Sequence, residues 1–532
     1  MTTTTFRSPR GRRLAGALQA LWVRALLGGR AIEQGALDAF LGGLTTHPRA
    51  EVARYVRGLA ARVTVITAVV LAVLHARREP GAVARFYQRF VGEADPRAVG
   101  VLRIATAGVA LLYVSFENVA DTAVLPRELA RAHGAFALLQ ALPGTPALAS
   151  SPEALAVFEG LSATVLAAAM LGLFTRITLP LGALVYFVCI SLLRQPTWAY
   201  HTGLIPFYLL TFLALAPWVG ADPGAALTLD RRAREPVSRE AAGWVRFGWV
   251  ALLFLPYVEA GLSKLCNAGP LWVGPTNMRA ILFMDSLDPM EFDFDGGLLL
   301  QSAPAAVFVF LGLAGMLGEI GMVFALTHRW GKRLFPAAMI GMHAGIVLLQ
   351  NVFFPDLILL LIAFYAMALL YDRGTGSPFD LSFAPARESV RDAPLARRRA
   401  TRLLGVTVAV MGAFWMLAIE WFPFTAMQMY AKVRGPEVEY VELHERTAEG
   451  WRRGRPDEVF PSLLDGRYRL ALRRCFDDEG PDPRCDLFLA SYLEARGPEV
   501  AELRVEKHRW NFVTAPDDAD HGEVIGVHRL RR

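Results

Sequence analysis

Long apolar runs recur along most of this chain and constrain its fold more than any other feature. Each run has about 17 to 23 residues, and a helix needs about 20 apolar residues to cross the hydrocarbon core of a bilayer. With 54% hydrophobic and only 20% charged residues among 532, the composition also fits a polytopic membrane protein. The sequence predicts an all-α membrane bundle over 95–424, with nine spans at about 101–118, 156–174, 177–194, 203–220, 244–263, 305–327, 334–351, 355–371 and 403–422.

The charges in the loops predict how these spans are oriented. Arginine and lysine gather in the loops at 221–243, 328–333 and 372–402, as they do in cytoplasmic loops. The 266–304 loop is acidic, with Arg279 as its only arginine or lysine, and therefore belongs outside. Nine spans starting from a cytoplasmic N-terminus satisfy all of these assignments. We therefore expect a multi-pass protein of the cell membrane whose C-terminal domain lies on the exoplasmic face.

The N-terminal region, 1–94, is basic and has a helical pattern. Two interpretations remain open: an amphipathic, interfacial segment on an anionic membrane surface, or a partly disordered basic tail. The apolar stretch from Val63 to Ala76 is too short for a span, so we expect an interfacial or buried helix there. The net charge of +6 arises from loops between apolar runs, so the lipid bilayer, and not nucleic acid, is the expected partner.

The C-terminal region, 425–532, is polar and predicts a small α+β or β-rich domain. Alternating runs at 438–442 and 468–472 support this prediction. Cys475 and Cys485 are candidates for a disulfide if the domain faces an oxidising compartment. The acidic residues between them do not have the spacing of a calcium-binding loop, so we expect solvated turns and no metal site.

Lys264 lies at the end of the apolar run that begins near Trp244. An ionisable residue at this position is either an anchor that reaches the head groups or a functional group. If it packs against apolar surface, loss of solvation favours the neutral amine, which is a base. Tyr257, Gly261 and Lys264 share one helix face, whereas Glu259 lies about 140° away and is not expected to be the partner of Lys264.

Two histidines complete the candidate chemistry. His201 opens the fourth span among aromatic residues, so it is either a proton carrier or an interfacial histidine. His343 lies within the seventh span, where it either functions or simply bonds a neighbouring helix. Glu319, in the sixth span, is a further polar residue whose role is open between function and pairing. After Lys264, the apolar stretch 281–284 is expected to dip back over the bundle and cover a cavity.

The segment from Tyr257 to Leu265, with Ala-Gly-Leu-Ser-Lys-Leu, followed by Trp272-Val-Gly274, resembles the vitamin K-dependent γ-glutamyl carboxylase family and its bacterial relatives, the HTTM (horizontally transferred transmembrane) domain proteins. The resemblance extends over about 95–375 and includes the segments around His201 and His343. It implies that Lys264 is the catalytic base and that the two histidines assist it. It also implies substrate binding by Tyr257, Gly261, Trp272 and Gly274. Ser263 replaces a lysine of the animal enzymes.

The resemblance implies a lyase whose lysine deprotonates reduced vitamin K or a related quinol. Oxygen and carbon dioxide are then the co-substrates, and a peptide glutamate on the exoplasmic side is carboxylated. The C-terminal region lacks the large exoplasmic part with which animal carboxylases hold their substrates. A non-enzymatic scaffold, or a peptide-maturation protein that uses the same bundle to engage a partner, is therefore the alternative hypothesis.

Overall fold

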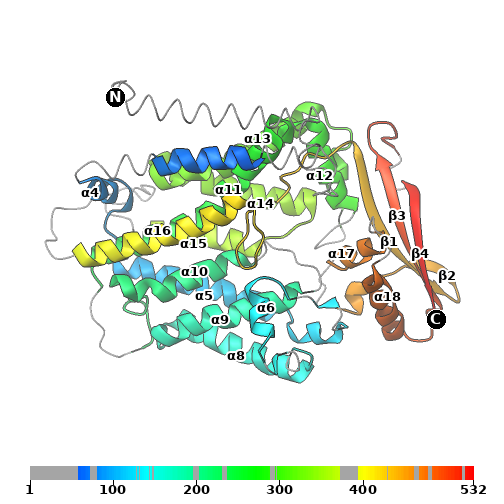
Figure 1. The fold of residues 1–532 in the computed structure, drawn as a ribbon, viewed down its shortest axis with the longest axis horizontal. Coiled ribbons are helices and arrows are strands. Elements are labelled where there is room, and N and C mark those ends of the chain that lie inside the picture. The colour runs from blue at the N-terminus through cyan, green and yellow to red at the C-terminus, as the bar shows by residue number, and fades with distance from the viewer. Residues whose placement is uncertain are drawn as a thin grey trace, which may run out of the picture.

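The protein is described by a computed structural model that is mostly helical, with a small sheet at one end (Figure 1). In Figure 1 most of the long helices run in roughly the same direction, and the strands lie beyond their ends. The description covers residues 58–71, 81–126, 129–130, 132–142, 144–145, 149–195, 203–230, 237–287, 294, 296–371, 394–427, 429–460, 467–476, 482–517 and 522–532.

Seven helices in the described part of the chain are long and apolar enough to cross a membrane. They are α5 (Pro96–Phe116), α8 (Pro152–Leu171), α9 (Thr175–Arg194), α11 (Arg239–Ala268), α13 (Ala305–Thr327), α14 (Arg329–Gln350) and α16 (Pro394–Leu417). The protein therefore carries several helices consistent with multi-pass insertion. The central one is α11, which packs against α5, α10, α13 and α16.

The other two expected spans are α10 (Leu204–Leu215), which is shorter than predicted, and α15 (Pro355–Tyr371), which has the predicted bounds. Gly203, with a φ of 70°, precedes α10, and Pro217 removes a backbone donor where α10 gives way to the 3₁₀ turn η5 (Ala216–Val219). The left-handed Asn351 separates α14 from α15. Apolar length alone does not register the interruptions at Gly203 and Pro217, and α15 has only 17 residues, so seven of the nine expected spans reach membrane length among the described residues.

Shorter elements fill the spaces around the bundle. They are a helix at Gly58–Leu71, α4 (Ala82–Phe86), η2 (Tyr87–Val91), η3 (Ala120–Val124), α6 (Ala135–Gln140), η6 (Gly269–Val273), α12 (Pro275–Leu287) and η7 (Leu298–Leu300). The Gly58–Leu71 helix is tied to the bundle by buried Arg62, which donates to the Trp415 carbonyl (3.2 Å) and to Asn267 Oδ1 (3.2 Å). The rest of the basic N-terminal region, 1–57 and 72–80, lies outside the described residues.

The C-terminal domain is a four-stranded antiparallel sheet with helices packed on one face, which confirms the predicted α+β class. Its elements are β1 (Glu437–Thr447), β2 (Gly450–Arg453), η8 (Pro456–Glu458), α17 (Arg467–Arg473), η10 (Arg474–Phe476), α18 (Pro483–Arg496), β3 (Glu502–Asn511) and β4 (Glu523–Arg531). The strand order is β2-β1-β3-β4. Val441, Leu443 and Val505 pack with Phe488 and Leu489 of α18 in the core of this domain.

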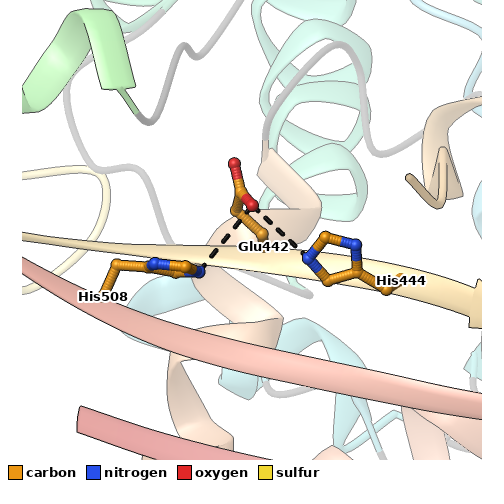
Figure 2. Close-up of side chains that lie close together, drawn as sticks. All are labelled: Glu442, His444 and His508. Carbon is orange, nitrogen blue, oxygen red and sulfur yellow. Dashed lines mark ion pairs between the residues drawn. The ribbon is translucent and has the colours of Figure 1, made fainter. Parts of the chain in front are cut away.

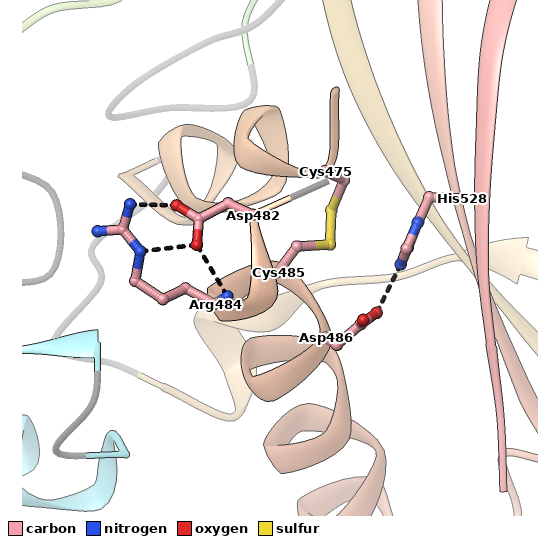
Figure 3. Close-up of a disulfide and its surroundings, with 6 residues drawn as sticks. All are labelled: Cys475, Asp482, Arg484, Cys485, Asp486 and His528. Carbon is pink, nitrogen blue, oxygen red and sulfur yellow. Dashed lines mark hydrogen bonds and ion pairs between the residues drawn. A yellow bond between two sulfur atoms is a disulfide. The ribbon is translucent and has the colours of Figure 1, made fainter. Parts of the chain in front are cut away.

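One expected strand is a helix. The alternating run at 468–472 forms α17, where Tyr468, Ala471 and Leu472 are buried, and Cys475 is buried in η10, which follows it. Their spacing of three and four residues is that of a helix face, and five alternating residues were too few to separate the two periods. Cys475 and Cys485 form a disulfide with a Cα–Cα distance of 5.2 Å, which joins η10 to the start of α18 (Figure 3).

Asp482 caps α18 and gives a testable pH dependence. Its Oδ1 accepts from the Arg484 backbone N–H (3.0 Å) and from Arg484 Nε (2.9 Å), as Figure 3 shows. The hydrogen bonds from Arg484 lower the pKa of this carboxyl to about 2. Because the folded pKa is depressed, its stabilisation is complete above the unfolded pKa of about 4 and is lost as the pH falls through about 2.

We expect Asp482→Ala to destabilise α18 by about 1 kcal/mol, the usual effect of losing an N-cap. Asp482→Asn keeps an acceptor for the cap and should lose less, but it should also lose the pH dependence between about pH 4 and 2. Hydrogen exchange of the α18 amides measures both effects. Equal exchange in the wild type and the alanine variant would contradict the capping role.

Aromatic packing joins the sheet to the bundle. The ring of Phe283 on α12 lies 5.5 Å from that of Trp510 and 5.4 Å from that of Phe512, centroid to centroid. These residues share a buried cluster with Trp272 of η6 and Val438 of β1. Consequently α12 lies between the long helices and the C-terminal domain, and its side chains contact both.

Candidate functional site

An apolar cavity of about 340 Å³ lies between α11, α13 and α14, with α12 and η6 forming part of its wall. Most of its lining is aliphatic, aromatic or methionine. Five polar side chains line it from the bundle: Tyr257, Lys264, Glu319, His343 and Gln350. A few convergent polar groups in an apolar pocket are the usual features of a small-molecule site. The cavity therefore brings together four of the predicted site residues, Tyr257, Lys264, Trp272 and His343, with Glu319.

Lys264 is buried and forms an ion pair with Glu319. Its Nζ lies 2.5 Å from Glu319 Oε1 and 2.6 Å from Oε2, and the two residues are only 5% and 6% exposed. The Trp272 ring lies 5.1 Å from Nζ, which adds a cation–π contact. Lys264 is therefore held inside the protein and does not extend to a lipid surface as an anchor. Glu259 lies elsewhere, as expected, and its carboxylate makes no hydrogen bond among the described residues.

Gly261 allows this pair to form. A Cβ at Gly261 would lie 2.8 Å from Ile320 Cγ1, 3.0 Å from Glu319 Cβ and 3.0 Å from the Ile320 backbone nitrogen. The absence of a side chain lets α13 approach α11 at the residue that carries the carboxylate, as small residues do in membrane helix packing. Gly261 was expected to bind substrate; it does not line the cavity, and its contacts are with α13.

His343 and Tyr257 form the second polar group of the cavity. Tyr257 Oη and His343 Nε2 are 2.8 Å apart, and both residues are buried. The His343 ring also packs edge-on against Phe354, at 5.5 Å between centroids. His343 Nδ1 is buried and makes no hydrogen bond with the described residues. One ring nitrogen is thus held by Tyr257, and the other is free to interact with a ligand.

The segment after Lys264 forms the wall nearest the C-terminal domain. Trp272 lines the cavity, and its Nε1 donates to the Tyr430 carbonyl (2.7 Å). Gly274 does not line it; its carbonyl accepts from Met278 N at the start of α12. Met278, Ile281 and Leu282 of α12 do line the cavity. The expected helix that folds back beside the bundle is therefore present as α12.

Three residues that line the cavity belong to the region, 425–532, that the sequence analysis assigned to the C-terminal domain. Met427, Met429 and Tyr430 line the cavity, although they follow α16. Tyr430 Oη donates to Asp285 Oδ2 of α12 (3.0 Å). Burial and this carboxylate raise the pKa of the Tyr430 hydroxyl, so it remains protonated. No sequence signal marked this segment, because it has neither a motif nor a charge pattern.

One predicted site residue is not tested by the structure. His201 lies outside the described residues, so its convergence with Lys264 stays a prediction. Arg103 of α5, a buried arginine, donates to the Leu227 carbonyl and ties α5 to the segment after α10. Glu319 is the residue whose importance the sequence understated, since a carboxylate inside a 23-residue apolar helix is itself a signal.

The Lys264 and Glu319 side chains can act together as one base. As an ammonium and a carboxylate it holds one transferable proton and can take up one more. Its apolar surroundings exclude water, which strengthens interactions with any charge formed next to it. The site can therefore accept a proton from a weakly acidic, apolar ligand.

No protein-family model, no curated protein and no solved structure matches this chain. The family suggested by the segment from Tyr257 to Gly274 therefore stays a prediction. The geometry of the cavity, with Lys264, Glu319, His343 and Tyr257 inside it, is what supports a function.

Proposed function

We propose that this protein is a membrane enzyme in which the Lys264–Glu319 pair removes a proton from a quinol-like lipid. The single observation that carries the proposal is the buried ion pair facing an apolar cavity of about 340 Å³. A quinol is apolar enough to partition into a bilayer and has a hydroxyl that a base can deprotonate. The aliphatic and methionine lining suits its ring and tail.

In the proposed step, Lys264 first passes a proton to Glu319, and its neutral amine then takes the proton of the quinol hydroxyl, which becomes an anion. The pair then holds an ammonium and a carboxylic acid, and its new positive charge stabilises the adjacent quinol anion. The Trp272 ring makes a cation–π contact with the Lys264 ammonium. His343, whose Nδ1 is available, is placed to hold a second polar group of the same ligand.

In the carboxylases that the sequence resembles, this anion reacts with oxygen to give the quinone epoxide and water. The strong base formed on the way removes a γ-proton from a peptide glutamate, which then adds carbon dioxide. The same reaction is our specific proposal for this chain. The packing of α12 and the segment containing Tyr430 between cavity and sheet supports a peptide substrate on the side of the C-terminal domain.

The test incubates the purified full-length protein with reduced naphthoquinone and oxygen and measures the epoxide by mass spectrometry. We expect Lys264→Ala to lower the rate at least 100-fold, because general base catalysis contributes about 10²–10⁴. A parallel incubation with labelled carbon dioxide and a glutamate-containing peptide tests the coupled carboxylation.

Lys264→Arg is the matched control, because arginine keeps the charge and can bind both Glu319 oxygens but cannot lose its proton. A folded arginine variant should therefore be as inactive as the alanine variant. Wild-type activity in the arginine variant would contradict the role of Lys264 as a base. A well-folded wild type that forms no epoxide would refute quinol oxygenation for this substrate.

A non-enzymatic scaffold is the second candidate, favoured by the closed ion pair, which satisfies both charges without a ligand. In that case the quinone would bind, quenching Trp272 fluorescence, without turnover. Binding without epoxide formation therefore separates the two proposals.

A further inference from the structure

Four ionisable side chains converge on the face of the sheet opposite α17 and α18. Glu442 and His444 come from β1, and Glu506 and His508 come from β3. The antiparallel register pairs Glu442 with Glu506 directly, and places His444 and His508 on either side of that pair. All four positions are even-numbered, so alternation puts them on the face opposite Val441, Leu443 and Val505.

The distances between the imidazole nitrogens and the carboxylate oxygens are close to those between ligands of a tetrahedral metal ion, and the ligand atoms of Glu442, His444 and His508 all lie within 4.8 Å of one another. Glu442 Oε2 lies 3.4 Å from His444 Nε2 and 3.7 Å from His508 Nε2. Glu506 Oε2 lies 3.4 Å from each of the same two nitrogens. Ligands of a tetrahedral zinc ion, with bonds of about 2.0–2.1 Å, are separated by about 3.3–3.4 Å. Figure 2 shows both imidazole rings directed toward the carboxylate of Glu442.

The hydrogen bonds of His508 leave its Nε2 available as a ligand. His508 is 8% exposed, and its Nδ1 lies 3.2 Å from the Gly522 carbonyl, to which it can only donate. This bond occupies Nδ1 and leaves Nε2 directed at the two carboxylates. Both His508 Nε2 and His444 Nε2 are buried and make no hydrogen bond with the described residues. Metal-bound histidines typically donate their other N–H to a carbonyl in this way.

The surrounding residues orient the carboxylates. Arg504 Nε lies 3.0 Å from Glu506 Oε1, which leaves Oε2 for the histidines. The Tyr440 ring stacks on His508 at 4.8 Å between centroids and nearly parallel, at 9°. Two glutamates directly opposite each other on neighbouring strands destabilise a sheet unless a cation lies between them. A bound cation would remove that repulsion.

We propose that Glu442, His444, Glu506 and His508 bind one divalent transition-metal ion, for which zinc is the appropriate probe. Two imidazoles and two carboxylates are a donor set that zinc accepts in closed sites. The ion would tie β1 to β3 and stabilise the sheet. The proposal is independent of the reaction in the cavity and departs from the sequence expectation of no metal site.

A second cluster, Cys485, Asp486 and His528, is a weaker candidate because Cys485 is in a disulfide and offers no thiolate. His528 Nε2 is instead 2.7 Å from Asp486 Oδ1, an ordinary ion pair or hydrogen bond (Figure 3). This cluster therefore serves as an internal control for histidines and carboxylates of the same domain.

The test measures zinc bound to the full-length protein in detergent after chelation and dialysis against zinc chloride. We expect one zinc per chain in the wild type. The variants His444→Gln, His508→Gln and Glu506→Gln should each bind zinc at least tenfold more weakly, since even outer-shell changes cost that much. Glu439→Gln, on the opposite face of β1, and His528→Gln should bind it as the wild type does.

X-ray absorption at the zinc edge identifies the ligands in the zinc-bound wild type, so the test does not depend on whether each variant folds. The expected spectrum of the wild type has two imidazole nitrogens and two oxygens at about 2.0–2.2 Å and no sulfur. A sulfur ligand would point to the free cysteines, Cys189 or Cys266, and would overturn the proposal. So would a folded wild type that binds no zinc, in which case the cluster is a network of protonated histidines and carboxylates.

Discussion

Replacing Glu319 with leucine should lower the free energy of unfolding by about 3–5 kcal/mol, because it leaves the Lys264 charge buried without a partner. Both side chains are less than 10% exposed, so water cannot take the place of the carboxylate. Equilibrium unfolding of the purified protein in mixed micelles measures the effect. The same variant should lose the quinol reaction, because one half of the proposed base is missing.

The double variant Lys264→Met/Glu319→Leu is the control for this prediction. Replacing both charges with apolar side chains of similar size is often neutral or stabilising, so most of the lost stability should return. Activity should not return, since the base is absent. If Glu319→Leu and the double variant were equally unstable, the loss would come from packing and not from an unpaired charge.

Replacing Gly261 with valine should destabilise the bundle by about 1–3 kcal/mol through overpacking. The first atom added would lie 2.8 Å from Ile320 Cγ1 and 3.0 Å from the Ile320 backbone nitrogen, so α13 must move away from α11. Because Glu319 precedes Ile320, this movement also separates the carboxylate from Lys264. We therefore expect a lower free energy of unfolding together with reduced quinol turnover.

Gly405→Val is the matched control, since no atom lies within 4 Å of a Cβ placed at this exposed position of α16. Its effect on unfolding should be within about 0.5 kcal/mol. Turnover should be that of the wild type. A loss of the same size in both variants would show that the effect reflects valine in a helix and not the contact between α11 and α13.

The local structure of the bundle follows from the sequence, because apolar length and helical period depend only on neighbouring residues. Tyr257 and Lys264 are seven residues apart and both face the cavity, as their shared helix face predicts. A pattern of only five residues did not predict the secondary structure correctly. The run at 468–472 fits either period, and its burial against α18 decided for the helix.

The partners of the site residues depend on contacts between distant segments. Glu319 is 55 residues from Lys264, and His343 is 86 residues from Tyr257. Glu319 was visible as a charge in an apolar run, but nothing in its neighbourhood indicates which helix it faces. The contribution of Tyr430 to the cavity had no signal at all, because it comes from the way the C-terminal domain packs on α12.

The proposed metal site also depends partly on local sequence and partly on tertiary structure. The sequence places Glu442 two residues before His444, and Glu506 two residues before His508, so each pair shares a face of its strand. Only the register of β1 with β3 brings the two pairs together. The sequence by itself thus determined which residues share a helix or strand face. The tertiary structure decided which faces meet, because pairing across segments depends on packing and register that no local pattern encodes.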